Sequence, residues 1–232
     1  MILKDYEKLP EKMKNDKVKE YYDIISKKKI SLVVKRIFDI FFSLVLLIIL
    51  SPILLILAIL IKIDSKGPVF YRQERVTTNG KIFRIFKFRT MVQNADKIGS
   101  LVTVGNDARI TRVGKLIRKV RLDEIPQLIN ILKGEMTFVG TRPEIKKYVD
   151  KYTDEMMATL LMPAGVTSIA SIKYKDEDEI LDKAVKAGKD TDVAYVEDVL
   201  PGKMKYNLEY IKQFSVLHDL KICIDTVIGV LR

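Results

Sequence analysis

Two adjacent carboxylates, Asp123 and Glu124, follow a cluster of basic side chains in the segment 113–128. Apolar residues at helical spacing after the pair, together with Pro126, predict that a helix begins between Asp123 and Pro126. The positive end of a helix stabilises an ionised carboxylate and also a bound phosphate, and the nearby Arg118 adds to both effects. The pair is therefore either an ordinary helix cap with an exposed glutamate beside it or the centre of a phosphate-handling site.

Further cations lie on a predicted β-hairpin. Residues 69–76 and 82–89 have the composition of two strands, and the Asn-Gly pair in the turn between them is a strong hairpin signal. In the second strand Lys87 and Arg89 share one face, because side chains alternate along a strand. They form either a solvated basic edge or a rigid pair of phosphate-binding groups.

Three other regions are expected to be loop-rich or exposed. Arg142 lies in a predicted tight loop over residues 138–144, where it either contacts phosphate or uracil or stabilises the loop. Residues 92–113 are expected to consist mainly of loops. The acidic stretch 175–198 is expected to form a surface helix and loop, which either sets substrate choice or is a solvated face.

The element that must position these groups is an uncharged apolar stretch, residues 40–61. A straight helix of that length reaches roughly 33 Å, enough to cross a hydrocarbon layer of about 30 Å. Pro52 has no N–H and should bend the helix, and the Ser51 hydroxyl can satisfy backbone that the bend leaves open, such as the carbonyl of Ile48. Basic residues flank both ends, so the positive-inside rule favours neither orientation. We expect a re-entrant helix, broken at Ser51 and Pro52, rather than a spanning one, although proline is tolerated in both.

Three charged residues lead into this stretch. Lys35 and Arg36 are expected to extend their charges to the membrane interface. Asp39 is less ordinary, because a carboxylate at the edge of the hydrocarbon layer needs a partner. Lys35 and Arg36, four and three residues earlier on the same helix, are the expected partners.

Composition narrows the possible partners. The formal net charge is +11, from 41 Lys and Arg against 30 Asp and Glu, which suits anionic lipid headgroups, nucleic acid or phosphorylated substrates. The apolar stretch favours the first and the third. No nucleic acid is expected, because the sequence shows neither a groove-reading helix nor a stacking platform. One cysteine, Cys223, and one histidine, His218, exclude a disulfide framework and a Cys/His zinc cluster.

The expected fold class is α+β and mainly helical. We divide the chain into a charged N-terminal extension (1–30), a re-entrant membrane helix (31–62) and a small cytosolic catalytic domain (63–232) that contains the hairpin. The extension is expected to be a solvated surface helix or a helix adsorbed to the membrane. The catalytic domain ends in two amphipathic helices, 206–214 and 219–231, which we expect at the interface. A removable signal peptide is not expected, because no small-residue cleavage site follows the apolar stretch.

Several short pieces, spaced in order along the chain, together match a known family. They are Lys35, Arg36 and Asp39; Ser51 and Pro52; Gly67 to Phe70; Lys87 to Met91; Arg118; Leu122 to Leu128; and Gly140, Arg142 and Pro143. With these pieces the chain resembles the bacterial sugar transferases, the monotopic phosphoglycosyl transferases that load a sugar-1-phosphate onto a polyprenyl phosphate. So many pieces in order are more specific than any one of them.

The resemblance implies a reaction and a set of roles. A sugar-1-phosphate would pass from a UDP-sugar to undecaprenyl phosphate with release of UMP, as the first membrane step in the assembly of a glycan such as an exopolysaccharide. Asp123 and Glu124 would be the catalytic dyad, with a covalent phosphosugar on Asp123. Mg²⁺ would be the cofactor, with the same two carboxylates as its neighbours. The phosphates would be bound by Lys87, Arg89, Arg118 and Arg142.

The resemblance also implies a location and has limits. The protein would lie in the bacterial inner membrane with its catalytic domain on the cytoplasmic face, and it would act as a monomer or a homodimer. Thr141 stands where the family usually has proline, and Asn207 aligns with a common aspartate. The pattern around residues 163–175 also departs from that of the family. We therefore assign no nucleotide- or sugar-contacting residue after Pro163, and the donor sugar stays open. The rival interpretation is a non-enzymatic, membrane-anchored scaffold that binds lipids.

Overall fold

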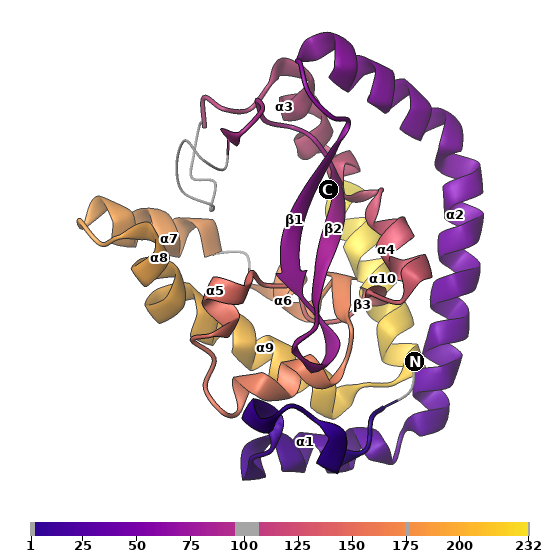
Figure 1. The fold of residues 1–232 in the computed structure, drawn as a ribbon, viewed down its shortest axis with the longest axis vertical. Helices are drawn as coiled ribbons and strands as arrows, with labels where there is room; N and C mark the ends of the chain where they lie inside the picture. Colours follow the sequence, from indigo (N-terminus) through magenta and orange to yellow (C-terminus); the bar gives the residue numbers. More distant parts are fainter. Residues whose placement is uncertain (1–2, 96–106, 175–176, 232) are drawn as a thin grey trace.

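The computed structural model describes residues 3–95, 107–174 and 177–231. This part of the chain is mainly helical and contains two small two-stranded sheets (Figure 1). The elements in chain order are η1 (Tyr6–Lys8), η2 (Glu11–Met13), α1 (Asp16–Ser26), α2 (Lys29–Asp64), β1 (Phe70–Val76), η3 (Thr78–Gly80), β2 (Ile82–Phe88), α3 (Arg112–Lys119), η5 (Leu122–Glu124), α4 (Gln127–Lys133), β3 (Met136–Val139), α5 (Lys146–Val149), η6 (Met156–Leu161), β4 (Ala164–Thr167), α6 (Ile169–Lys173), α7 (Glu177–Lys186), α8 (Thr191–Ala194), η7 (Tyr195–Val199), α9 (Leu200–Gln213) and α10 (Val216–Leu231).

The apolar stretch lies in one long helix, α2, which contains Pro52. Figure 1 shows α2 running along one side of the molecule and then curving over its top. The Ser51 hydroxyl donates a hydrogen bond of 2.8 Å to the carbonyl of Ile48, the group that Pro52 deprives of its N–H partner. This role of Ser51 is therefore confirmed. The expected division into two helices is not observed, because the helix continues through the proline to Asp64.

Most apolar side chains of α2 are exposed, including Ile37, Phe41, Ile48 and Leu55. By length and composition, α2 is a candidate membrane helix. An apolar surface of this extent is costly in water, so association with a membrane accounts for it.

The charged residues at the start of α2 hold it against the domain. Lys35, only 5% exposed, donates to Asp219 of α10 and to the carbonyl of Val139. Asp39 accepts hydrogen bonds from the Thr137 hydroxyl and from a backbone N–H of β3. The expectations that Lys35 extends to the membrane interface and that Asp39 pairs with its own helix are therefore wrong. Both side chains face the folded domain, where a buried charge needs a partner.

Arg36 was also expected at the interface, and it too binds the domain instead. Its guanidinium donates to the carbonyls of Ile131 and Leu132 at the end of α4. These carbonyls belong to the last turn of a helix, where carbonyl groups lack intrahelical partners.

The predicted hairpin is confirmed. Strands β1 and β2 pair antiparallel with Phe70 opposite Phe88 and Val76 opposite Ile82. Asn79 and Gly80 both have positive φ, which a tight turn between two such strands requires. The hydrogen bond from the Arg89 N–H to the Val69 carbonyl extends the pairing by one step beyond the strands.

A second, parallel sheet of β3 and β4 was not expected from the sequence. Each strand has only four residues, and the partners are far apart in the chain. Gly140 and Gly165 let the two segments approach closely, because a Cβ built on Gly165 would lie 2.2 Å from the Gly140 nitrogen.

The largest cluster of buried apolar side chains joins the two ends of the chain. Val18, Tyr21 and Ile25 of α1 pack in the same core as Ile211 and Phe214 near the end of α9. The N-terminal extension thus contributes one face to the core and is not solvated all round. The predicted C-terminal helices are confirmed as α9 and α10, which begin earlier than expected.

Two predicted regions lie partly outside the described residues. Residues 96–106 of the expected loops at 92–113 are outside, and so are residues 175–176 of the acidic stretch 175–198. The described part of the acidic stretch comprises α7, α8 and η7, with a short non-helical connection at residues 187–190, as the expected helix and loop.

We predict that Lys35→Met destabilises the protein by about 3 kcal/mol, because it leaves Asp219 buried without its cation. The measurement is the midpoint of denaturant unfolding in detergent micelles. The control is Lys62→Met, which removes an exposed lysine of the same helix and should change stability by no more than about 0.5 kcal/mol. Equal midpoints for the two variants would show that the buried pair does not hold α2 to the domain.

Candidate active site

The two adjacent carboxylates lie on a turn between α3 and α4. Arg121 has a φ of 53°, in the left-handed region that residues other than glycine seldom adopt, and it reverses the chain after α3. Asp123 and Glu124 follow in the short helix η5, and α4 begins at Gln127. The prediction that a helix begins between Asp123 and Pro126 is confirmed to within one residue.

Glu124 is held by two cations. Its Oε1 accepts hydrogen bonds from Lys87 of β2 at 2.8 Å and from Arg142 at 3.0 Å. Burial alone would raise the pKa of Glu124, but the charges of Arg142 and Lys87 outweigh this effect and hold the pKa well below its usual range. Glu124 is therefore ionised and fixed in position.

Asp123 is in a different environment. Within the described residues it forms no ion pair, and its side chain lines a cavity of about 550 Å³. Burial and the neighbouring Glu124 charge raise the pKa of Asp123, while the charges of Lys87 and Arg118 oppose the shift. Of the two carboxylates, Asp123 is the one that is open to a ligand in this cavity.

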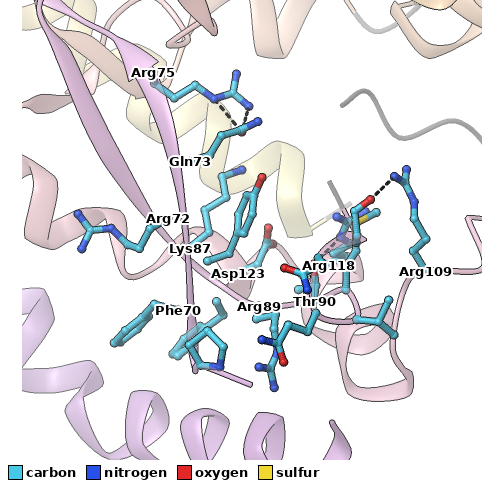
Figure 2. A pocket seen from close by; sticks show the side chains of 18 residues that line it. Phe70, Arg72, Gln73, Arg75, Lys87, Arg89, Thr90, Arg109, Arg118 and Asp123 are labelled. Atoms are coloured by element: carbon cyan, nitrogen blue, oxygen red, sulfur yellow. Dashed lines mark hydrogen bonds between the residues drawn. The ribbon is translucent and has the colours of Figure 1, made fainter. Parts of the chain in front are cut away.

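The same cavity brings together most of the predicted phosphate-binding residues, as Figure 2 shows. It is lined by Pro68, Phe70, Tyr71, Arg72, Gln73, Arg75, Lys87, Phe88, Arg89, Thr90, Met91, Val92, Gln93, Asn94, Ala95, Arg109, Arg118 and Asp123. Glu124 and Arg142 do not line it. Arg142 instead lines a second cavity of about 180 Å³, and two residues of β1, Gln73 and Arg75, line both cavities.

Two of the arginines in the larger cavity have additional contacts. Arg118 donates through Nε to the Thr90 hydroxyl at 2.8 Å, which fixes its direction. Arg89 is only 5% exposed and donates to the carbonyls of Ile61 and Ser65 at the end of α2. Arg89 thus ties the end of the apolar helix to the cavity, and its role in binding phosphate stays a prediction.

Sequence reasoning missed Gln73 and Arg75. Both nitrogens Nε and Nη2 of Arg75 donate to the Gln73 amide oxygen, and Nη1 donates to the carbonyl of Pro143. Neither contact neutralises the guanidinium, and the pKa of Arg75 is lowered by burial. The two residues lie two positions apart in a strand and therefore share a face, a signal that was present in the predicted hairpin.

The carboxylates fit a metal ion only in part. In residues 3–95, 107–174 and 177–231 no group of three or more His, Cys, Asp or Glu side chains could hold one. Both side-chain hydrogen bonds to Glu124 within the described residues fall on Oε1. Mg²⁺ commonly takes one or two carboxylates and completes its shell with phosphate oxygens and water. The pair therefore suits a Mg²⁺ ion that arrives with a phosphorylated substrate.

Comparison with known proteins relates this site to a family. The model of the family described as bacterial sugar transferase matches residues 30–232. A UDP-N-acetylgalactosamine-undecaprenyl-phosphate N-acetylgalactosaminephosphotransferase of Aeromonas hydrophila is 34% identical over 84% of this chain and 43% of its own length. A UDP-glucose:undecaprenyl-phosphate glucose-1-phosphate transferase of Klebsiella pneumoniae is 37% identical over 85% of this chain and 40% of its own.

The chain thus spans less than half the length of these two relatives. A third relative, the exopolysaccharide production protein PSS of Rhizobium leguminosarum bv. phaseoli, is 35% identical to this chain. The match covers 85% of this chain and 95% of that relative. The region shared by all three relatives covers most of this chain, including Asp123 and its surroundings.

We predict that Glu124→Gln weakens the dependence of stability on pH. The pKa of Glu124 is lower in the folded protein than the value of about 4.3 in an unfolded chain, so the unfolded chain takes up the proton first. The stability from ionised Glu124 is therefore complete above about pH 5 and is lost as the pH falls toward the folded pKa. The measurement is the unfolding midpoint between about pH 6 and pH 3.

The control for this prediction is Glu7→Gln, which changes an exposed glutamate and should leave the native profile unchanged. A Glu124→Gln profile as steep as the native one would contradict the ion pairs with Lys87 and Arg142.

Proposed function

The chain belongs to the bacterial sugar transferase family, and on this basis we propose that it transfers a sugar-1-phosphate from a UDP-sugar to polyprenyl phosphate and releases UMP. The observation that supports this function best is the placement of Asp123 at the wall of a cavity that Lys87 and Arg118 also line. A nucleophile beside two cations is the arrangement that transfer of a phosphoryl group requires.

The reaction proceeds in two displacements. An oxygen of Asp123 attacks the β-phosphorus of the donor, the bond from that phosphorus to the bridging oxygen breaks, and UMP leaves with the electron pair. The sugar phosphate is then bonded to the aspartate. A phosphate oxygen of the polyprenyl acceptor attacks the same phosphorus and displaces the carboxylate, which gives a polyprenyl diphosphate sugar and regenerates the enzyme.

The assignment of Asp123 as the nucleophile follows from the contrast between the two carboxylates. Glu124 is bound by two cations, which lowers its basicity and holds it in place. Asp123 forms no ion pair with any described residue and has a raised pKa, so its carboxylate is the better nucleophile. Lys87, Arg118 and Arg142 surround the pair and offset the charge of the diphosphate, and Arg89 adds a fourth cation at the end of α2.

Mg²⁺ is part of the proposal. Asp123 and Glu124 would hold it, and the ion would neutralise phosphate oxygens of the donor. Lys87 and Arg142 fix the Glu124 side chain in position.

We place α2 as a re-entrant helix in the cytoplasmic membrane, with the rest of the chain on the cytoplasmic face. The domain contacts α2 along its whole length, from Lys35 through Leu46 and Leu50 to Asp64. If α2 spanned the bilayer, its two ends would lie on opposite sides of a layer about 30 Å thick, and one domain could not contact both. Exposed apolar residues of α10, among them Leu217 and Ile224, suit contact with the same surface.

This placement brings the two substrates to one site. The acceptor phosphate lies at the level of the lipid headgroups, whereas the nucleotide sugar arrives from the cytosol. Arg89 links the end of α2 to the wall of the larger cavity, so this cavity lies next to the membrane end of the helix. The acceptor phosphate and the nucleotide sugar can therefore both reach Asp123. The reaction would be the first membrane step in the synthesis of a polysaccharide, the process that the name of the Rhizobium relative indicates.

We predict that the purified protein, with undecaprenyl phosphate and Mg²⁺, releases UMP from at least one UDP-sugar. Asp123→Asn should lower the rate by about a thousandfold or more, because the nucleophile is lost. Glu124→Gln should lower it by about a hundredfold, because Lys87 and Arg142 lose their anchor. The measurement is UMP release over a panel of UDP-sugars. Without acceptor, the protein mass should increase by one sugar phosphate.

The matched control is Asp154→Asn, which changes an exposed aspartate that lines neither cavity and should leave the rate unchanged. Undiminished UMP release by Asp123→Asn would refute the assignment of the nucleophile and would favour a scaffold.

Burial raises the pKa of Asp123. We therefore predict that, as the pH is lowered, the rate falls to half at a pH above the pKa of an exposed aspartate, about 3.9. Arg118→Met removes a positive charge that lowers this pKa, so the acid limb should move to higher pH. The measurement is the pH dependence of kcat/KM, which reports the pKa values of the free enzyme. Lys119→Met, an exposed neighbour on the same helix, is the control, and an Arg118→Met limb at or below the native pH would contradict the electrostatic argument.

A further inference from the structure

The second cavity, of about 180 Å³, has a polar floor that the proposed mechanism does not use. The side chains of Glu144, Lys203 and Tyr195 are each about 5% exposed and bind one another. Lys203 donates to Glu144 at 3.1 Å and to the Tyr195 hydroxyl at 2.7 Å, and that hydroxyl donates to Glu144 at 2.7 Å. Burying such charges costs free energy even when they are paired, and apolar side chains of similar size would fill the same space at lower cost. The cluster therefore suggests a role in binding.

The cluster is charged and rigid. Burial opposes ionisation of Glu144, but the charges of Lys203 and Arg75 outweigh it and hold the pKa of Glu144 below its usual value. At the rim, Glu177 of α7 accepts a hydrogen bond from Lys203 at 3.0 Å, and its side chain is one-third exposed. Lys203 thus donates to all three of the other groups, Glu144, Tyr195 and Glu177, and fixes them around a small space.

The cavity adjoins the reactive centre. Arg142 lines it and also binds Glu124, the neighbour of Asp123. Arg75 lines both this cavity and the larger one that contains Asp123. A group bonded directly to a phosphorus atom at Asp123 could therefore extend past Arg75 into the smaller cavity.

We propose that the smaller cavity binds the sugar of the donor, with Glu144, Glu177 and Tyr195 as the groups that recognise its hydroxyls and Lys203 as the cation that holds these three in place. This inference rests on the proposed function. In a UDP-sugar the sugar is joined to the β-phosphorus through one oxygen, whereas uracil is separated from it by the α-phosphate and the ribose. The group next to the reacting phosphorus is thus the sugar.

The chemistry of the lining agrees with this assignment. Each sugar hydroxyl can donate a hydrogen bond, which suits the carboxylate oxygens of Glu144 and Glu177 and the phenol oxygen of Tyr195. A uracil ring would be expected to stack on an open aromatic face. The rings of Tyr148 and Tyr195 pack on each other with centroids 4.4 Å apart, so their facing sides are already occupied.

The test uses two variants that preserve shape. Glu177→Gln changes one partly exposed rim carboxylate, and Tyr195→Phe removes one hydroxyl. Each should raise KM for the best UDP-sugar of the panel about tenfold, because a hydrogen bond to a charged or buried group is lost. The affinity for UMP, which lacks the sugar that is transferred, should not change and is measured by calorimetry. Glu179→Gln is the matched control, because it makes the same change on the same helix at an exposed residue paired with Lys183.

The possible outcomes distinguish a failure of the sugar subsite from a failure of the proposed function. A raised KM for UDP-sugar with unchanged UMP affinity, together with an altered order of preference among UDP-glucose, UDP-galactose and their N-acetylamino counterparts, supports a sugar subsite. Equal losses of UMP and UDP-sugar affinity would mean that the cavity binds the nucleoside and would overturn the inference, as would variants that behave like Glu179→Gln. If the native chain released UMP from no donor, the proposed function would fail, and the sugar subsite with it.

Discussion

The cost of burying a charge without a partner determines how the apolar helix is joined to the rest of the protein. Helix α2 offers lipids an apolar surface, yet Lys35 and Asp39 face inward and are almost fully buried. Each finds its partner in a segment distant in sequence, Lys35 in α10 and Asp39 in β3. These partners leave α2 only one low-energy orientation on the domain, because rotation would leave both charges unpaired. The apolar helix is thus oriented by its few polar residues.

The same constraint separates the roles of two neighbouring carboxylates. Glu124 satisfies its charge with Lys87 and Arg142 and so becomes part of the framework. Asp123 is left without an ion pair among the described residues, beside cations that a phosphate could share. Adjacent positions on one short turn therefore provide a fixed group and a reactive group, and the difference comes from the side chains that converge on them from β2 and the loop after β3.

What the sequence predicted well was local. The hairpin turn, the start of α4 and the contact of Ser51 with Ile48 depend on residues within a few positions of one another. The pairing of β3 with β4 and the partners of Asp39 depend on segments that only folding brings together, and no short pattern encodes them. In the site, charge and spacing singled out the carboxylate pair and the hairpin cations, and the family resemblance assigned their roles, whereas Gln73 and Arg75 were recognised only from the geometry of the two cavities.

Hydrogen bonds at the end of α2 connect the apolar helix to the residues around Asp123. The Asp64 carboxylate accepts a hydrogen bond from the N–H of Val113 in α3, the helix that carries Arg118. Arg89 donates hydrogen bonds to the carbonyls of Ile61 and Ser65. The depth at which this end sits in a lipid layer is set by hydrophobic matching. A thinner or thicker bilayer would displace the end of α2, and these bonds would pass the displacement to the cationic wall around Asp123. In the proposed transfer reaction, the thickness of the surrounding lipid layer would then affect the geometry at Asp123 through these contacts at the end of α2.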